Sequence, residues 1–298
     1  MDSTTIYENV RARYSATARA ETSPSHAKVV AQAFGYSAEE LASIPSDSNL
    51  GLSCGNPIAL ASLKEGETVV DLGCGAGFDV FLASNKVGEK GMAWGVDMNE
   101  DMLKKARLNA SKTGTTNVSF VQSRITAIDI PTASADVIIS NCVINLVPYD
   151  EKHLVFKEMH RLLKPGGRVA VSDILSKKPL PEDLKSNVAL YVGCVAGASS
   201  KEDYEEWLKE AGFDNVLVVD AGSDLNVYMQ DGANAGCCPG VEEPAEVEPA
   251  EVEPVKNQSC CGVQQNSDGG VAEDMKRDLS DLDVNEWAGS FKVFAFKK

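Results

Sequence analysis

Eight cysteines carry the most distinctive chemistry of this 298-residue chain. Thiolates are soft donors that select thiophilic ions, and three of them converging on one point would hold a trivalent metalloid in a pyramidal cage. Free cysteines are also among the most frequently buried residues, so spacing alone does not separate a ligand cage from unrelated core thiols. Four cysteines stand alone and four form two vicinal pairs: Cys54, Cys74, Cys142, Cys194, Cys237–Cys238 and Cys260–Cys261.

A second chemical feature is the glycine-rich segment DLGCGAGFD (71–79). Gly73, Gly75 and Gly77 allow a tight turn and let a ligand approach the backbone, where a Cβ would clash. Asp97 follows Gly77 by twenty residues, at the end of a second apolar run. A carboxylate at this spacing can accept hydrogen bonds from both hydroxyls of a ribose, so the segment predicts a nucleoside-containing cofactor.

The glycine pattern excludes two common nucleotide sites. A dinucleotide site would read G-x-G-x-x-G, whereas Gly77 is followed by Phe78, Asp79 and Val80. A phosphate-binding P-loop would need G-K-[ST], which is absent.

The elements that position these residues alternate between strand and helix. Helices are predicted from Phe78, from Asn99 to Lys112, from Pro148 into the LKPGG segment (163–167), and from Ser200 to Ala211; Ser37 and Glu40 have the spacing of a capping box. Strands are predicted at 68–72, 92–97, 117–121, 135–140, 168–174, 215–220 and 291–297. Such alternation indicates an α/β fold with a mostly parallel sheet covered by helices on both faces.

Composition divides the chain further. Residues 221–285 hold 14 acidic and 3 basic residues and include the repeat VEEPAEVEPAEVEPV (241–255). Regularly spaced Pro and mutually repelling Glu prevent a helix or a core there. We therefore expect a helical extension over 1–50, a core over 51–220, a disordered acidic insertion over 221–285 and a terminal strand over 286–298 that completes the sheet.

Charge and hydropathy limit the partners and the location. The formal charge of −16 disfavours a nucleic-acid partner, and the apolar run Val137–Val147 is interrupted by polar residues and too short to span a membrane. The sequence MDSTTIYENV lacks the pattern of a secretory signal, so we expect a cytoplasmic protein whose thiols serve ligation or redox chemistry.

The form D-x-G-x-G-x-G at 71–77 and the segment LKPGGRVAVSD (163–173) resemble class I S-adenosylmethionine-dependent methyltransferases. The resemblance implies a Rossmann-like, seven-stranded sheet whose seventh strand is antiparallel, lies beside the fifth and pairs with the sixth. It also implies S-adenosylmethionine as the cofactor, with Asp71 at its methionine end and Asp97 on the ribose. The cofactor-binding residues would be Asp71, Gly73, Cys74, Gly75, Gly77, Asp97, Met98, Ile125 and Asn141.

Three further segments, GLSCGNP (51–57), SNCVINLVP (140–148) and YVGCVAGA (191–198), resemble the arsenite S-adenosylmethionine methyltransferases. The resemblance implies that Cys142 and Cys194 bind trivalent arsenic, and that Cys54 completes the trithiolate site or exchanges disulfides during turnover. Arsenite and methylarsenite would be substrates, and a thiol reductant such as glutathione or thioredoxin would be a co-substrate.

The chain departs from that family at two points. No cysteine precedes Cys54, so external thiols or a C-terminal pair would have to reduce arsenic between methylations. Cys74 stands where the family usually has Ser, which we interpret as a tolerated small residue. For Cys237, Cys238, Cys260 and Cys261 two interpretations remain, dispensable surface thiols or an accessory relay that gathers trivalent arsenic.

Two other functions remain open. A methyltransferase for another small acceptor, such as a thiol or a quinol, would keep the glycine loop without depending on Cys142 and Cys194. A non-catalytic, metalloid-sequestering relative would bind arsenite without transferring a methyl group. The number of methyl groups added is not predicted, and a monomer is the default expectation.

Overall fold

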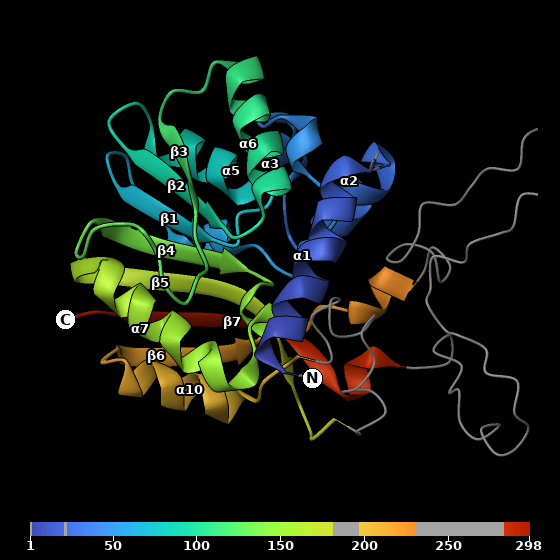
Figure 1. The fold of residues 1–298 in the computed structure, drawn as a ribbon, viewed down its shortest axis with the longest axis vertical. Coiled ribbons are helices and arrows are strands. Elements are labelled where there is room, and N and C mark those ends of the chain that lie inside the picture. The colour runs from blue at the N-terminus through green and yellow to red at the C-terminus, as the bar shows by residue number, and fades with distance from the viewer. Residues whose placement is uncertain (1, 21–22, 181–196, 230–282) are drawn as a thin grey trace, which may run out of the picture.

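The computed structural model describes residues 2–20, 23–180, 197–229 and 283–298. They contain one sheet in the order β3-β2-β1-β4-β5-β7-β6 (Figure 1). The strands are β1 (Thr68–Leu72), β2 (Met92–Asp97), β3 (Val118–Gln122), β4 (Ala135–Asn141), β5 (Leu163–Ser176), β6 (Asp214–Asp220) and β7 (Ala288–Phe296).

Strands β1 to β5 pair in parallel, and β7 pairs antiparallel with both β5 and β6. This confirms the predicted α/β class, the seven strands and the antiparallel seventh strand between the fifth and the sixth. The carboxyl ends of the parallel strands therefore meet at one edge, where open α/β sheets bind their ligands.

The helices begin where the sequence offers caps. They are α1 (Ser3–Arg19), α2 (Pro24–Ala33), α3 (Ala38–Ala42), α4 (Pro57–Ala61), α5 (Phe78–Val87), α6 (Glu100–Thr113), α7 (Lys152–Leu162) and α10 (Lys201–Glu210). Ser37 and Ser200 form capping boxes, and the Asn99 side chain accepts from the first turn of α6. Each cap supplies an acceptor for backbone N–H groups that the helix itself leaves unpaired.

One predicted boundary is wrong. The LKPGG segment (163–167) is not a helical terminus, because α7 ends at Leu162 and β5 begins at Leu163. Leu163 pairs with Ala135, a register shift follows, and Gly166 donates to the Lys297 carbonyl. Pairing with neighbouring strands on both sides thus extends β5 further toward its amino end than Pro165 and Gly166 suggested.

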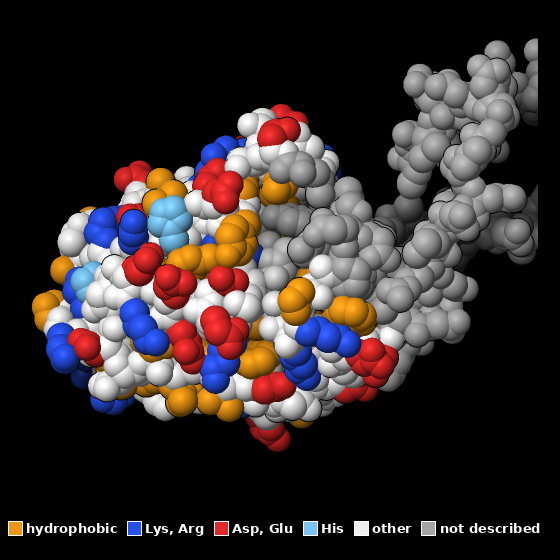
Figure 2. All heavy atoms as spheres, turned by 90° about the horizontal axis from the view of Figure 1, so that it is seen from below, with side chains coloured by type: hydrophobic (Ala, Val, Ile, Leu, Met, Phe, Trp, Pro, Cys, Tyr) orange, Lys and Arg blue, Asp and Glu red, His pale blue; other side chains and the backbone are white. Residues whose placement is uncertain are grey.

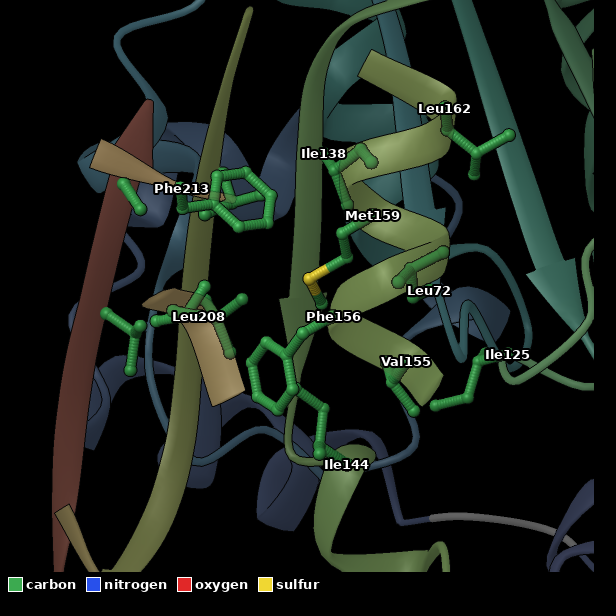
Figure 3. Close-up of a cluster of buried hydrophobic side chains, with 14 of the residues drawn as sticks. Leu72, Ile125, Ile138, Ile144, Val155, Phe156, Met159, Leu162, Leu208 and Phe213 are labelled. Carbon is green, nitrogen blue, oxygen red and sulfur yellow. The ribbon is translucent and has the colours of Figure 1, made fainter. Parts of the chain in front are cut away.

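Two apolar clusters cover the two faces of the sheet. One packs α7 and α10 against β4, β5 and β7, and Figure 3 shows Phe156 and Met159 of α7 directed at Ile138, Leu208 and Phe213. The other packs α4, α5 and α6 on the opposite face, with Leu82, Leu103 and Ile139 as members. These two layers fix the sheet and leave its carboxyl edge to the amino-terminal helices.

A third cluster lies at that edge. It joins α1 and α2 to Cys54, Cys142 and Ile174, and also contains Leu225 and Val284. The last two belong to the short 3-10 helices η4 (Leu225–Met229) and η6 (Val284–Glu286), which flank residues outside the described ranges. Most of the predicted acidic insertion lies outside the described residues.

The outer surface mixes charges of both signs. Figure 2 shows Lys and Arg side chains interspersed with Asp and Glu on the face seen from below. Elsewhere on the surface, exposed ion pairs such as Lys104–Glu100 also join opposite charges. Among the described residues, no helix is long and apolar enough to cross a membrane.

Candidate active site

A cavity of about 130 Å³ opens at the carboxyl edge of the sheet. The glycine loop, the ends of β2 and β4, the loop after β3 and residues of α1 surround it. Of the predicted site residues, those lining it are Asp71, Gly73, Cys74, Gly75, Asp97, Met98, Ile125, Asn141 and Cys142.

The glycine loop is held against the end of β2. The N–H groups of Gly73 and Cys74 donate to the Val96 carbonyl, at 2.8 and 3.0 Å. The Gly75 N–H donates to Oδ2 of Asp97 at 2.9 Å, and Oδ1 of Asp97 accepts from the Asn99 N–H at 2.8 Å. Gly75 has φ +51° and its missing Cβ would face almost open space, so the backbone itself borders the cavity.

Three carboxylates surround this loop: Asp71 and Asp79 are buried, and Asp97 is half-buried. Burial raises the pKa of Asp71 well above its ordinary range, and the charges of Asp79 and Asp97 raise it further. Burial also raises the pKa of Asp97, and it raises that of Asp79 to about 6 against the opposing hydrogen bonds from Tyr36 and Asn141. Crowded, desolvated carboxylates of this kind favour a positively charged ligand.

Of the three carboxylates, that of Asp71 has the greatest need of a stabilising ligand. It is 3% exposed and lines the cavity, and the charges of Asp79 and Asp97 act on it. A buried carboxylate beside two others is costly, so a bound cation or donor would stabilise it. The site therefore fits a cofactor with a ribose for Asp97 and a cationic end for Asp71.

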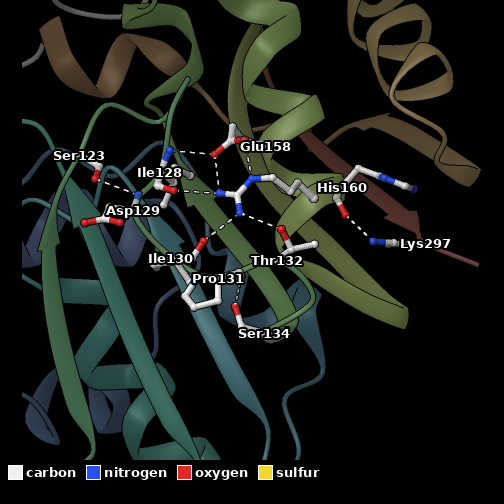
Figure 4. Close-up of polar contacts among 11 residues, drawn as sticks. Ser123, Ile128, Asp129, Ile130, Pro131, Thr132, Ser134, Glu158, His160 and Lys297 are labelled. Carbon is white, nitrogen blue, oxygen red and sulfur yellow. Dashed lines mark hydrogen bonds and ion pairs between the residues drawn. The ribbon is translucent and has the colours of Figure 1, made fainter.

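The loop after β3 brings Ile125 to the cavity, and α7 fixes that loop. Arg161 donates to the carbonyls of Ile128 and Ile130, at 2.8 and 2.9 Å, while Glu158 accepts from the Ile128 N–H at 2.8 Å (Figure 4). Bidentate pairing between Arg161 and Glu158 orients both side chains. The position of Ile125 thus depends on an ion pair that does not itself touch the cavity.

Cys54 and Cys142 form a disulfide, with their Cα atoms 5.8 Å apart. Cys54 is fully buried, and Cys142 lines the cavity just beyond β4. Cys142 has φ +58°, a conformation that costs a non-glycine residue about 1–2 kcal/mol and is found mainly where function requires it. That backbone turn directs Cys142 off the strand to meet Cys54, which comes from the loop before α4.

Asn141 connects the cysteines with the carboxylates. Its Oδ1 accepts from the backbone N–H of Cys54 at 3.2 Å, and its Nδ2 lies 3.1 Å from Oδ2 of Asp79. Tyr36 donates to the other oxygen of Asp79 at 2.7 Å. The sequence assigned Asn141 to the cofactor alone, whereas here it lines the cavity and also positions Cys54.

A second buried polar group lies on the other side of the disulfide. The sulfurs of Cys54 and Cys142 and a carboxylate oxygen of Asp173 all lie within 4.8 Å of one another. Asp173 accepts from Asn145 Nδ2, Tyr204 OH and its neighbour Ile174 N–H, each at 2.9 Å. Burial raises the pKa of Asp173 to about 6, against the opposing effects of these hydrogen bonds and of the Lys152 charge.

The other predicted site residues lie in the turn before α5, beside Gly95 or outside the described residues. Gly77 does not line the cavity; with φ +92° it forms the turn into α5. Cys74 is buried beside Gly95, and a Cβ on residue 95 would clash with the Cys74 sulfur. A small side chain therefore fits at position 74. Five predicted thiols lie outside the described residues: Cys194, Cys237, Cys238, Cys260 and Cys261.

Sequence reasoning missed several polar residues of the site. Asp79 and Asp173 belong to segments singled out for other reasons, and an acid at the end of a strand or glycine loop could have drawn attention to them. Tyr36, Asn145 and Lys152 carry no such signal, because their roles depend on contacts between distant parts of the chain.

Comparison with known proteins places this geometry in context. A family profile described as a methyltransferase domain matches residues 63–212. Over 207 residues the chain is 44% identical to an arsenite methyltransferase of Halobacterium salinarum, covering 65% of this chain and 52% of that protein. It is 36% identical over 188 residues to the arsenite methyltransferase of Mus musculus, covering 60% and 49% of the two chains.

Among solved structures, an arsenic(III) S-adenosylmethionine methyltransferase from Chlamydomonas reinhardtii superposes with a TM-score of 0.54 at 24% identity, over 94% of this chain and 75% of that one. This likeness supports the class I methyltransferase fold. The chain spans about half the length of the curated relatives it matches.

Proposed function

Because the chain belongs to the methyltransferase-domain family, we propose that it transfers a methyl group from S-adenosylmethionine to trivalent arsenic held by cysteine thiolates. The observation that carries the proposal is that Cys142, paired with Cys54, lines the same cavity as the glycine loop and Asp97. A thiophilic acceptor and a nucleoside-containing donor would therefore meet in one enclosed space.

The carboxylates and the glycine loop would hold the cofactor, which supplies an electrophilic methyl group on a sulfonium. Each oxygen of Asp97 accepts one backbone N–H and retains a lone pair for a ribose hydroxyl. Asp71, which is buried beside the charges of Asp79 and Asp97, would face the cationic methionine end. Gly75 would let the ligand lie against the backbone.

The substrate would be arsenite, and methylarsenite in a later round, bound by Cys54, Cys142 and Cys194. Gly197 is the first described residue after Cys194, and its carbonyl accepts from the buried Lys152 ammonium, which also contacts Asn145. Asn145 in turn donates to Asp173, beside the two sulfurs. Cys194 lies three residues before this anchor, and its role as the third thiolate is proposed from the resemblance of YVGCVAGA (191–198) to the arsenite methyltransferases.

Thiolate-bound arsenic retains a lone pair, which would form the arsenic–carbon bond as the carbon–sulfonium bond breaks. No proton leaves the nucleophile, so no general base is required at this step. The protein would contribute alignment, which can supply about 7–11 kcal/mol, and a site from which water is excluded.

Methyl transfer formally oxidises arsenic by two electrons, and two thiols that become a disulfide would return them. The Cys54–Cys142 disulfide is the form expected after that reduction. A thiol reductant of the glutathione or thioredoxin class would then restore both thiols. A C-terminal cysteine pair, Cys237–Cys238 or Cys260–Cys261, is the alternative source of the restoring thiols.

The test is transfer of labelled methyl from S-adenosylmethionine to arsenite with a thiol reductant present. We expect methylated arsenic from the wild type and nearly none from Cys142→Ser or Cys194→Ser. Each variant should still bind S-adenosylhomocysteine with wild-type affinity. This control shows that the variant is folded and that loss of activity does not come from loss of cofactor binding.

Two outcomes would contradict the proposal. Activity that survives both substitutions would remove the thiolate site and favour another small acceptor. A wild type that binds cofactor and arsenite without forming product would indicate a sequestering relative.

The C-terminal cysteine pairs form a separate part of the proposal. Tethered thiols raise the local concentration of arsenic ligands, so Cys237, Cys238, Cys260 and Cys261 would gather arsenite when it is scarce. Replacing all four with Ser should slow turnover at low arsenite and leave it unchanged at saturation. Unchanged turnover at low arsenite would remove the relay.

A further inference from the structure

The cluster of Cys54, Cys142 and Asp173 contains a carboxylate that the proposed methyl transfer does not use as a ligand. The three residues come from the loop before α4, the end of β4 and the body of β5, and one ligand atom from each lies within 4.8 Å of the others. All three are buried, and Cys142 also borders the cavity. Two thiolates and a carboxylate are an established combination of donors for a thiophilic divalent cation.

Asp173 is oriented in the manner of a metal-binding carboxylate. Its Oδ1 accepts from Asn145 and the Ile174 N–H, and its Oδ2 accepts from Tyr204. These donors hold the carboxylate in place, with one of its oxygens within 4.8 Å of both sulfurs. Outer partners that fix a ligating side chain in this way raise metal affinity by holding its geometry.

The charges of the cluster also balance with a divalent cation. Two thiolates and one carboxylate carry three negative charges, and the buried ammonium of Lys152, which contacts Asn145, supplies one positive charge nearby. A divalent cation would bring the formal sum to zero. Buried charge without such compensation is strongly unfavourable.

We propose that, once its disulfide is reduced, the protein binds a thiophilic divalent cation of the zinc class through Cys54, Cys142 and Asp173, and that this cation excludes arsenite from the two sulfurs. Binding would displace one proton from each thiol to solvent and form two metal–sulfur bonds and one metal–oxygen bond. The cavity beside Cys142 would provide entry and a fourth ligand position for water. The proposal uses thiols that the proposed function also uses, but needs neither methyl transfer nor Cys194.

Cadmium titration of the reduced protein under anaerobic conditions tests the proposal, because thiolate-to-cadmium charge transfer absorbs in the ultraviolet. The full chain with Ser at positions 74, 194, 237, 238, 260 and 261 serves as the background, so that other thiols do not compete. We expect one cadmium ion per chain, with an absorbance corresponding to two thiolates. Cys54→Ser and Cys142→Ser should each remove most of that absorbance.

Asp173→Asn in this background should weaken cadmium binding by at least about 10-fold, since loss of even an outer-shell partner typically costs 10- to 100-fold. Asp136→Asn is the control, an aspartate at the start of β4 that pairs with Lys164 and lies outside both the cavity and the cluster, and it should leave cadmium affinity unchanged. If Asp173→Asn does not fold, a cobalt spectrum of the background variant still reports whether the site is four-coordinate with two thiolates. Arsenite should displace cadmium.

Unchanged affinity in Asp173→Asn, absence of a cadmium signal, or a cobalt spectrum without two thiolates would overturn the proposal. The titration contains neither S-adenosylmethionine nor a methyl acceptor. Absent cadmium binding with normal arsenic methylation would therefore remove only this inference, and cadmium binding without methylation would remove only the proposed function.

Discussion

Single residues at the cavity divide into two electrostatic environments. Around the glycine loop, Asp71 and Asp79 are buried and Asp97 is half-buried, and desolvation raises the pKa of each. Beside the cysteines, Asp173 is also buried, but Lys152 and three hydrogen-bond donors offset its charge. The first environment favours a cationic ligand. In the second, the charges of Asp173 and Lys152 balance only while Cys54 and Cys142 are neutral thiols or form their disulfide.

Burial of Asp79 should make stability depend on pH. In the folded protein its pKa is raised to about 6, against about 3.9 in an unfolded chain. Between these values the folded state holds a proton that the unfolded state lacks, so Asp79 contributes stability that is fully present below about pH 4 and lost as the pH rises through about 6. Asp79→Asn should abolish this contribution, which is on the order of 2–3 kcal/mol.

Urea unfolding of the wild type and Asp79→Asn at about pH 5 and pH 7.5 measures that effect. The stability of Asp79→Asn relative to wild type should rise between the two pH values. Asp101→Asn, on partly exposed α6, controls for removal of one negative charge. Parallel curves for wild type and Asp79→Asn would contradict the expectation.

Asp97 should contribute to cofactor affinity through its charge. Asp97→Asn removes the charge from hydrogen bonds to Gly75 and to a ribose, and charge-assisted bonds contribute about 1.5–3 kcal/mol each. We expect about 10- to 100-fold weaker binding of S-adenosylhomocysteine by calorimetry. Asp101→Asn, in the first turn of α6, should bind S-adenosylhomocysteine normally. Equal affinities in the two variants would refute the assignment of Asp97.

At the level of elements, local signals predicted most of what positions the cofactor side. The caps at Ser37, Asn99 and Ser200 depend on neighbours within a few residues, and each lies where the sequence placed it. The longer β5 depends on pairing with β4 and β7, which no local pattern encodes. Asn141 likewise meets Cys54 across 87 positions, so its positioning role follows only from the folded chain.

The chain on either side of residues 230–282 is held together by a small set of hydrogen bonds. Asn226 donates to Asp283 and accepts from the Val284 N–H, and Asn285 accepts from the Leu225 N–H. These bonds join η4 to η6 directly before β7 enters the sheet. The link gives β7 its starting position independently of the length of chain between.

Replacement of residues 230–282 by a short Gly-Ser linker should therefore preserve the sheet. Loop-closure entropy falls as a loop shortens, so we expect unfolding free energy to rise by roughly 1–2 kcal/mol. Thermal denaturation measures the change, and Asn226→Ala in the shortened chain should reverse part of it. A large loss of stability would mean that the removed residues contribute to the fold.

For the whole molecule, the Cys54–Cys142 disulfide joins segments 88 positions apart. Crosslinks of this span restrict the unfolded chain by roughly 4 kcal/mol on the chain-entropy account. Reductant should therefore lower the melting temperature of the wild type and leave that of Cys54→Ser unchanged. A fall of equal size in both proteins would show that the reductant acts elsewhere.

The insertion of β7 between β5 and β6 has a consequence for biosynthesis. Because β7 is the last strand to be synthesised, β5 has no partner on that edge until residues 288–296 have left the ribosome. The apolar edge of β5, with Val169 and Val171, is until then an unpaired strand edge of the kind on which chains aggregate. The strand order therefore leaves the sheet incomplete until synthesis of the chain has almost ended.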